Sequence, residues 1–106
     1  MFSISFTEAQ NKPVEARSTA ADSFYKFIKD IRSIGELEAQ IKQKEQELDY
    51  LDELISIYDN LNCEEIAEHA AVKYNRLREE VLLLQLKKVD LEREVIIFEL
   101  NSVRNA

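Results

Sequence analysis

The chain has one glycine, one proline and no tryptophan among its 106 residues. So little turn-forming material does not suit the many turns of a sheet-rich fold, which leaves an all-α fold as the expectation. Hydrophobic residues make up 45% of the chain, which is too apolar for a disordered acidic tail. The composition therefore predicts one small domain built from amphipathic helices.

Residues for catalysis and ligand binding are also scarce. Cys63 and His69 each occur once, and a separation of six residues places them on different sides of a helix. A Cys–His nucleophile, a bundle metal site with repeated Glu-x-x-His motifs and a glycine-rich phosphate loop all need residues that are missing here. We therefore expect no enzyme activity, no cofactor, no metal and no small-molecule substrate.

Signals for secretion and membrane insertion are absent from the sequence. The start from Met1 to Glu8 lacks the basic residues and the continuous apolar core of a secretory signal. The most apolar stretch, residues 81–100, carries several charged side chains, which argues against a membrane span. A single cysteine forms no internal disulfide. We expect a cytoplasmic protein without membrane contact.

The net charge of −7 is unevenly distributed. Residues 1–35 hold five basic and four acidic groups, residues 36–65 hold two and ten, and residues 66–106 hold seven of each. This distribution gives no electrostatic footprint for DNA or RNA. The acidic middle is typical of either a solvated helix face or a surface for a basic protein partner.

The first residues have a different pattern from the rest of the chain. Phe2, Ile4 and Phe6 alternate with small polar residues, and a period of two indicates a strand or an extended segment. We predict a flexible or extended arm over residues 1–17, followed by a helical hairpin over residues 18–106. The arm is either a mobile tail or a segment whose Phe2 and Phe6 dock in a groove on a neighbour or partner.

A first long helix is predicted from about residue 22 to 59. Its apolar residues repeat with alternating steps of three and four, which is typical of a coiled-coil seam, and its opposite face is polar. Gly35 lies inside this helix at a cost of about 1 kcal/mol and marks a close crossing, a kink or a tolerated irregularity. The seam residues are Ile34, Leu37, Ile41, Lys44, Leu48, Leu51, Ile55 and Tyr58.

A turn is predicted at residues 60–62. Asn60 suits the left-handed conformation that ends a helix, and Asn62 with Glu65 resembles a capping box. The second helix then covers residues 63–103 and runs antiparallel to the first, which places Lys44 near Glu79 and Glu80, and Lys88 near Gly35. One continuous helix in a parallel dimer is the alternative.

The second helix carries apolar residues on two faces that point about 155° apart. The first helix covers only one of them, so the other face needs a further helix. We predict that it forms a homodimer interface in a four-helix bundle, antiparallel because this offsets Arg93 from its own copy. The covered face has Leu77, Val81, Leu84, Leu91, Val95 and Phe98; the other has Leu82, Leu86, Val89, Arg93, Ile96, Leu100 and Val103.

These patterns favour a non-enzymatic protein–protein interaction module, such as an adaptor, chaperone or assembly factor. Aromatic and acidic residues near the hairpin tip form a candidate site for a basic partner, although the tyrosines also suit the end of the core. One alternative is a subunit of a hetero-oligomeric coiled-coil complex, and another is an acidic inhibitor that mimics nucleic acid. The candidate tip residues are Asp49, Tyr50, Asp52, Glu53, Tyr58 and Asp59.

Overall fold

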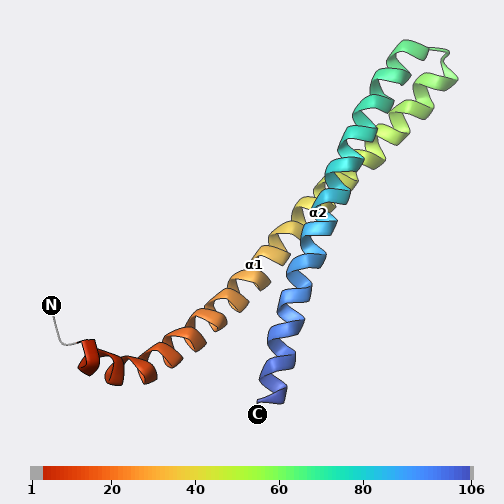
Figure 1. Ribbon diagram of the computed structural model, residues 1–106. Coiled ribbons are helices and arrows are strands. Elements are labelled where there is room, and N and C mark those ends of the chain that lie inside the picture. The colour runs from red at the N-terminus through yellow and green to blue at the C-terminus, as the bar shows by residue number, and fades with distance from the viewer. Residues whose placement is uncertain (1–3, 106) are drawn as a thin grey trace.

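The protein is a hairpin of two long helices. The computed structural model describes the backbone of residues 4–105 and the side chains of residues 19–105. Helix α1 covers Ile4–Asn60 and helix α2 covers Glu64–Arg104, and the two pack antiparallel along each other (Figure 1). Residues 4–105 contain no strand. The predicted all-α hairpin is confirmed, and the alternative of one continuous helix is wrong.

Helix α1 begins much earlier than the sequence pattern predicted. The expected start was near residue 22, after an arm over residues 1–17, whereas residues 4–17 belong to α1. A helix satisfies its backbone hydrogen bonds within one segment, whereas a lone strand needs a partner strand that this chain does not offer. Phe2 lies outside the described residues, and for Phe6 only the backbone is described.

The turn between the helices is a Schellman motif. Asn62 has a φ of 58°, the Cys63 N–H donates to the Tyr58 carbonyl at 2.9 Å, and the Asn62 N–H donates to the Asp59 carbonyl at 3.1 Å. The prediction of Asn60 as the left-handed residue is therefore wrong. The predicted capping box at Asn62 is also wrong, because Cys63 is the N-cap and makes no side-chain cap bond.

The interface between α1 and α2 follows the predicted seam. Every predicted seam residue on α1 is buried or half-buried, and so is every residue of the covered face on α2. Ile41, Leu48 and Val81 form the buried core cluster, against which Tyr74, Leu77 and Leu84 pack. Steps of three and four keep one face of each helix turned toward the other over the packed part of the hairpin, which accounts for this agreement.

Two lysines at seam positions make ion pairs between the two helices. Lys44 Nζ lies 3.2 Å from Glu80 Oε2, and Lys88 Nζ lies 3.6 Å from Glu38 Oε1. Each lysine keeps its aliphatic stem along the seam while its ammonium reaches a carboxylate at the edge. The predicted approach of Lys44 to Glu80 is confirmed, and Lys88 meets Glu38, one turn from Gly35.

The two helices separate toward their terminal ends, which we call the open end. There Phe27 of α1 stacks on Phe98 of α2 with ring centroids 4.3 Å apart. Beyond this pair, α1 turns away from the carboxyl-terminal end of α2 (Figure 1). No helix in the described part of the chain is long and apolar enough to cross a membrane.

Candidate protein–protein interface

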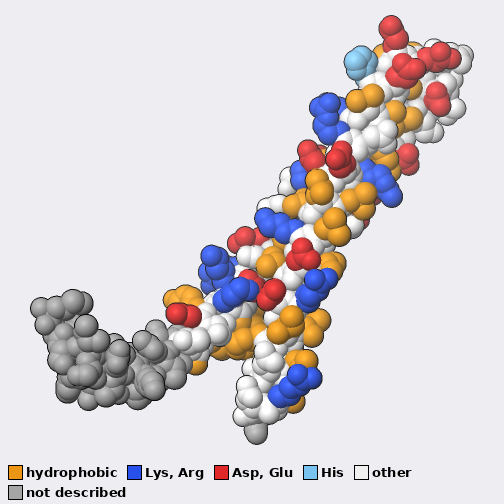
Figure 2. All heavy atoms as spheres, viewed as in Figure 1, with side chains coloured by type: hydrophobic (Ala, Val, Ile, Leu, Met, Phe, Trp, Pro, Cys, Tyr) orange, Lys and Arg blue, Asp and Glu red, His pale blue; other side chains and the backbone are white. Residues whose placement is uncertain are grey.

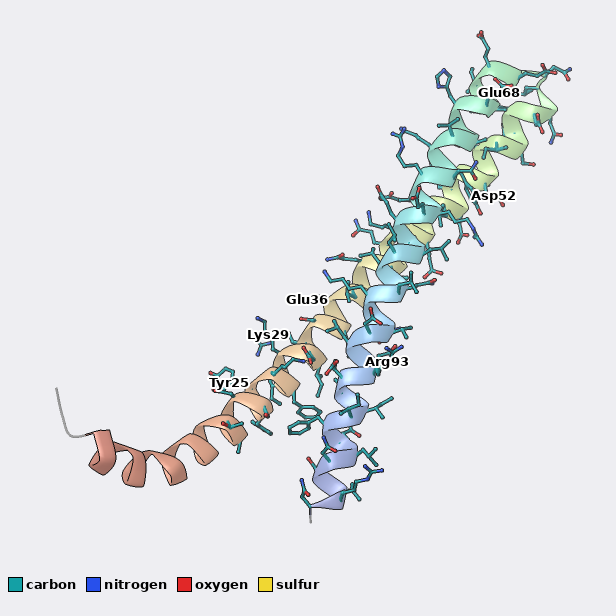
Figure 3. The ribbon with its side chains drawn as sticks, viewed as in Figure 1. Tyr25, Lys29, Glu36, Asp52, Glu68 and Arg93 are labelled. Carbon is teal, nitrogen blue, oxygen red and sulfur yellow. The ribbon has the colours of Figure 1, made fainter. Side chains whose placement is uncertain are left out.

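An apolar stripe runs along the side of α2 that α1 leaves uncovered. Its six apolar side chains are 45–75% exposed, and Figure 2 shows hydrophobic side chains along the shaft of the hairpin. Arg93 interrupts the stripe and lies on the side of α2 away from α1 (Figure 3). We call this set the outer stripe: Leu82, Leu86, Val89, Arg93, Ile96, Leu100 and Val103.

The outer stripe has the spacing of a second coiled-coil seam. Its residues follow one another in steps of four and three, offset alternately by one and two positions from the seam that packs on α1. It extends over three heptads, or about 32 Å at 1.5 Å per residue. Leu83 and Ile97, which are 59% and 44% exposed, widen it on one flank. The face is thus long enough to pack another helix.

A shallow hollow lies on the outer stripe. It has a volume of about 370 Å³ and is lined by Leu82, Gln85, Leu86 and Val89. These residues stand at positions i, i+3, i+4 and i+7, which is the set of four that forms a hole for a knob from a facing helix. The surface therefore has the local shape, as well as the spacing, that helix packing requires.

The candidate tip residues lie on several sides of α1. Asp52 and Asp59, seven residues apart, share one flank, whereas Asp49 and Glu53 lie on the back of the helix. All four carboxylates are exposed, and Figure 3 shows Asp52 near the turn. Tyr58 is half-buried at the end of the seam. The role of these residues in binding stays a prediction.

Tyr50 lies on the other flank of α1, beside basic residues of α2. It is 62% exposed and lines a groove of about 370 Å³ together with Lys73, Arg76 and Glu47, among others. The groove has both acidic and basic walls. The surface near the turn is therefore acidic on one flank and mixed in charge on the other.

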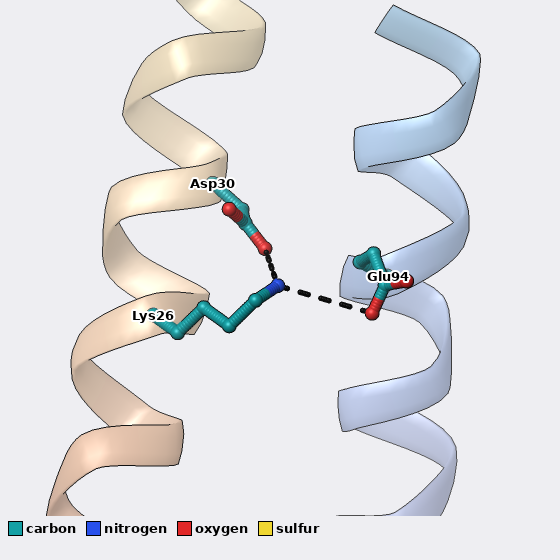
Figure 4. Close-up of polar contacts among 3 residues, drawn as sticks. All are labelled: Lys26, Asp30 and Glu94. Atoms are coloured by element: carbon teal, nitrogen blue, oxygen red, sulfur yellow. Dashed lines mark hydrogen bonds and ion pairs between the residues drawn. The ribbon is translucent and has the colours of Figure 1, made fainter. Parts of the chain in front are cut away.

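A cluster of three charged residues lies at the end of the seam nearest the open end. Lys26 Nζ lies 2.8 Å from Asp30 Oδ2 and 3.8 Å from Glu94 Oε2 (Figure 4). Asp30 is only 8% exposed and takes a seam position four residues before Ile34. The hydrogen bond from Lys26 to Asp30 raises the pKa of the Lys26 ammonium above its ordinary value of 10.5.

Sequence reasoning missed Asp30 and Phe27 as members of the seam. Continuing the alternation from Ile34 by steps of four and three toward the amino terminus gives these two positions. The charge of Asp30 hid the pattern, because a carboxylate rarely occupies a buried seam position without a partner. Lys26, one turn earlier on the same helix, is the partner whose presence in the sequence could have identified Asp30 as a seam residue.

The residues considered for catalysis do not converge. His69 is exposed on α2, and Cys63 is half-buried at the turn with its Sγ 3.8 Å from the Leu61 carbonyl oxygen. Within the described residues, no three His, Cys, Asp or Glu side chains form a group that suits a metal ion. The outer stripe is accordingly the candidate site that the geometry defines best.

Comparison with known proteins finds no matching family model, no similar curated protein and no similar solved structure. The fold and the outer stripe define the class as a two-helix coiled-coil hairpin with one unpartnered helix face.

Proposed function

We propose that this chain is a non-enzymatic protein–protein interaction module that works as a homodimer. The outer stripe of α2 packs against the outer stripe of a second copy, which joins two hairpins into a four-helix assembly. The observation that carries the proposal is the exposure of six apolar residues at coiled-coil spacing on the face that α1 does not cover. A contiguous apolar face of this kind marks an interaction site in a protein that exists in water.

The energetics of this pairing are of the right size. Complete burial of a large apolar side chain contributes about 1.5–3 kcal/mol. The six apolar residues of the outer stripe are about half exposed, so two copies gain on the order of 10 kcal/mol by pairing. The entropic cost of association is of similar size. The net affinity is therefore a small difference between two larger quantities, and charges on the interface have a large influence on it.

The mass of the protein in solution tests the proposal. We expect light scattering coupled to size exclusion to give the mass of a dimer for the wild type. The double variant L86D/I96D places two carboxylates on the outer stripe and is expected to run as a monomer that keeps its helical circular dichroism. A wild-type monomer, or a dimeric L86D/I96D, would contradict the proposal.

A matched control variant tests whether the loss of the dimer is specific to the outer stripe or occurs at any exposed apolar residue. Ile57 and Val72 are 46% and 58% exposed and lie near the turn, outside the outer stripe. The variant I57D/V72D introduces the same number of charges in place of exposed β-branched residues. It is expected to keep the mass of the dimer, and a monomeric control would show that the stripe is not the specific contact.

A hetero-oligomeric complex is the second candidate, and an apolar patch on α1 favours it. Phe24, Tyr25, Ile28 and Ile31 are 40–79% exposed near the open end. Since α1 packs on the inner face of α2, pairing through the outer stripe leaves this patch uncovered. Expression of the chain by itself distinguishes the two candidates: a soluble dimer supports the first, and an aggregated chain supports a missing partner subunit.

A further inference from the structure

The outer stripe has one charged residue, which lies at its middle. The stripe runs over residues 82–103, so its midpoint falls next to Arg93. Arg93 is exposed, and among the side chains of residues 19–105 it makes no ion pair. Its neighbours along the stripe are Val89 and Ile96, which offer no counter-charge. Any helix that covers the outer stripe therefore meets a guanidinium group at its centre.

We infer that the outer stripe binds best to a helix of complementary charge. This partner is an amphipathic helix of another protein that has the same apolar spacing and carries a carboxylate opposite Arg93. The inference rests on the proposed function in one respect, namely that the outer stripe is the contact face. It adds the chemistry of the preferred partner, and it makes the homodimer the weaker of the two complexes that this face forms.

A second copy places one arginine against another, whichever way the two hairpins run. In a parallel pair each residue of the outer stripe lies beside its own copy, so Arg93 lies beside Arg93. In an antiparallel pair, full overlap of the stripe requires a two-fold axis at its midpoint, and Arg93 again lies within about one helical turn of its copy. Two guanidinium groups between apolar side chains repel each other and lose hydration, which weakens both arrangements.

The acidic residues next to Arg93 in the sequence do not remove this contact. Asp90 and Glu92 lie on opposite flanks of the outer stripe. A second copy brings its own Arg93 together with these carboxylates, so the contact between the two arginines remains. A partner with a carboxylate in place of Arg93 replaces this repulsion by an ion pair and keeps the apolar contacts of the stripe. One charged or polar residue in an apolar seam sets partner choice in coiled coils in this way.

The hollow on the outer stripe adds a second feature to the partner. It is lined by Leu82, Gln85, Leu86 and Val89, and its centre lies about two helical turns, or about 11 Å, from Arg93. A large apolar side chain fills the hollow when the partner carries one at the same separation from its carboxylate. The surface thus selects for a charge and an apolar knob at a fixed spacing.

A mixture of the wild type with R93E measures the preference. R93E keeps the apolar residues of the outer stripe and presents a carboxylate at the position of Arg93, so it serves as a partner of the inferred chemistry. Equal amounts are brought to equilibrium, and native mass spectrometry distinguishes the mixed dimer from the two homodimers. Without a preference, about half of the dimers are mixed. We expect about three quarters, which corresponds to a shift of about tenfold in the exchange equilibrium.

The mixture isolates the contact between the two residues at position 93. Interactions of residue 93 with all other groups of the opposite chain contribute equally to the homodimers and to the mixed dimer, so they cancel in the exchange equilibrium. The remaining Coulomb energy varies with the square of the charge difference between the two chains. R93Q halves this charge difference, so its mixture with the wild type is expected to shift the exchange equilibrium only about twofold.

A charge reversal elsewhere controls for net charge. R32E makes the same change at an exposed position on the side of α1 opposite its seam, and we expect its mixture with the wild type to stay near the statistical proportion. A statistical mixture with R93E, or an equal preference with R32E, would overturn this inference and leave the proposed homodimer standing. Monomers in every sample would overturn the proposed function as well.

Discussion

The half of the hairpin near the turn, which we call the turn half, and the half near the open end, which we call the open half, are built differently. The turn half contains the buried cluster of Ile41, Leu48 and Val81, has one charged seam residue, Lys44, and exposes single apolar residues such as Ile57 and Val72. The open half has Asp30 and Lys88 at seam positions, contains Gly35, and carries most of the outer stripe. The half with more charged residues at seam positions is thus the half with the apolar outer face, so the proposed pairing would add stability where the hairpin has least.

Truncation of the seam gives the largest expected contrast between the halves. In the L86D/I96D background, Leu48→Ala is expected to lower the free energy of unfolding by about 2–5 kcal/mol, because Leu48 is 7% exposed and its removal leaves a cavity. Ile34→Ala in the open half is expected to cost about 1 kcal/mol, since Ile34 is half-buried. Urea unfolding followed by circular dichroism measures both, and equal costs would show that the two halves of the seam are equally stable.

Substitution of Gly35 is expected to stabilise the open half. A Cβ built at Gly35 meets no atom within 4 Å, so the residue does not mark a close crossing. Gly35→Ala is expected to raise the free energy of unfolding by about 0.5–1 kcal/mol, because alanine loses less backbone entropy in a helix. Amide hydrogen exchange should slow mainly in the open half. A destabilised variant, or a gain confined to the turn half, would contradict this account.

Alkaline pH gives the smallest expected effect, again in the open half. The pKa of Lys26 is raised in the folded state by its hydrogen bond to Asp30. The resulting stability is complete below pH 10.5 and is lost as the pH rises through the folded-state pKa. Lys26 is exposed, so the loss is small.

Thermal melts between about pH 9 and pH 12 compare the wild type with Lys26→Met. The variant retains every tyrosine, so phenol ionisation contributes equally to both proteins. We expect the melting temperature of the wild type to fall more steeply over this range. Parallel slopes would show that the contact between Lys26 and Asp30 adds nothing to the stability of the open half.

Most of the hairpin was predictable from local spacing. The alternation of apolar residues identified the seam from Ile34 to Tyr58, the two faces of α2 and the approach of Lys44 to Glu80, because helix geometry converts spacing directly into direction. The start of α1 was missed, because five alternating residues at the amino terminus resemble a strand. The details of the turn were missed because Asn60 and Asn62 both suit the left-handed conformation, and only the hydrogen bonds to Tyr58 and Asp59 select Asn62.

The residues and their spacing suffice to show that this protein is helical and that α2 has two apolar faces, since both depend only on positions within one segment. The placement of the two helices in space adds that the seam continues beyond Ile34 to Asp30 and Phe27. It also decided that Asp30 is tolerated in the seam, where Lys26 bonds to it from the preceding turn and Glu94 approaches from the other helix. Burial and ion pairing across two helices depend on how the helices are placed in space, and spacing within one segment does not encode that placement.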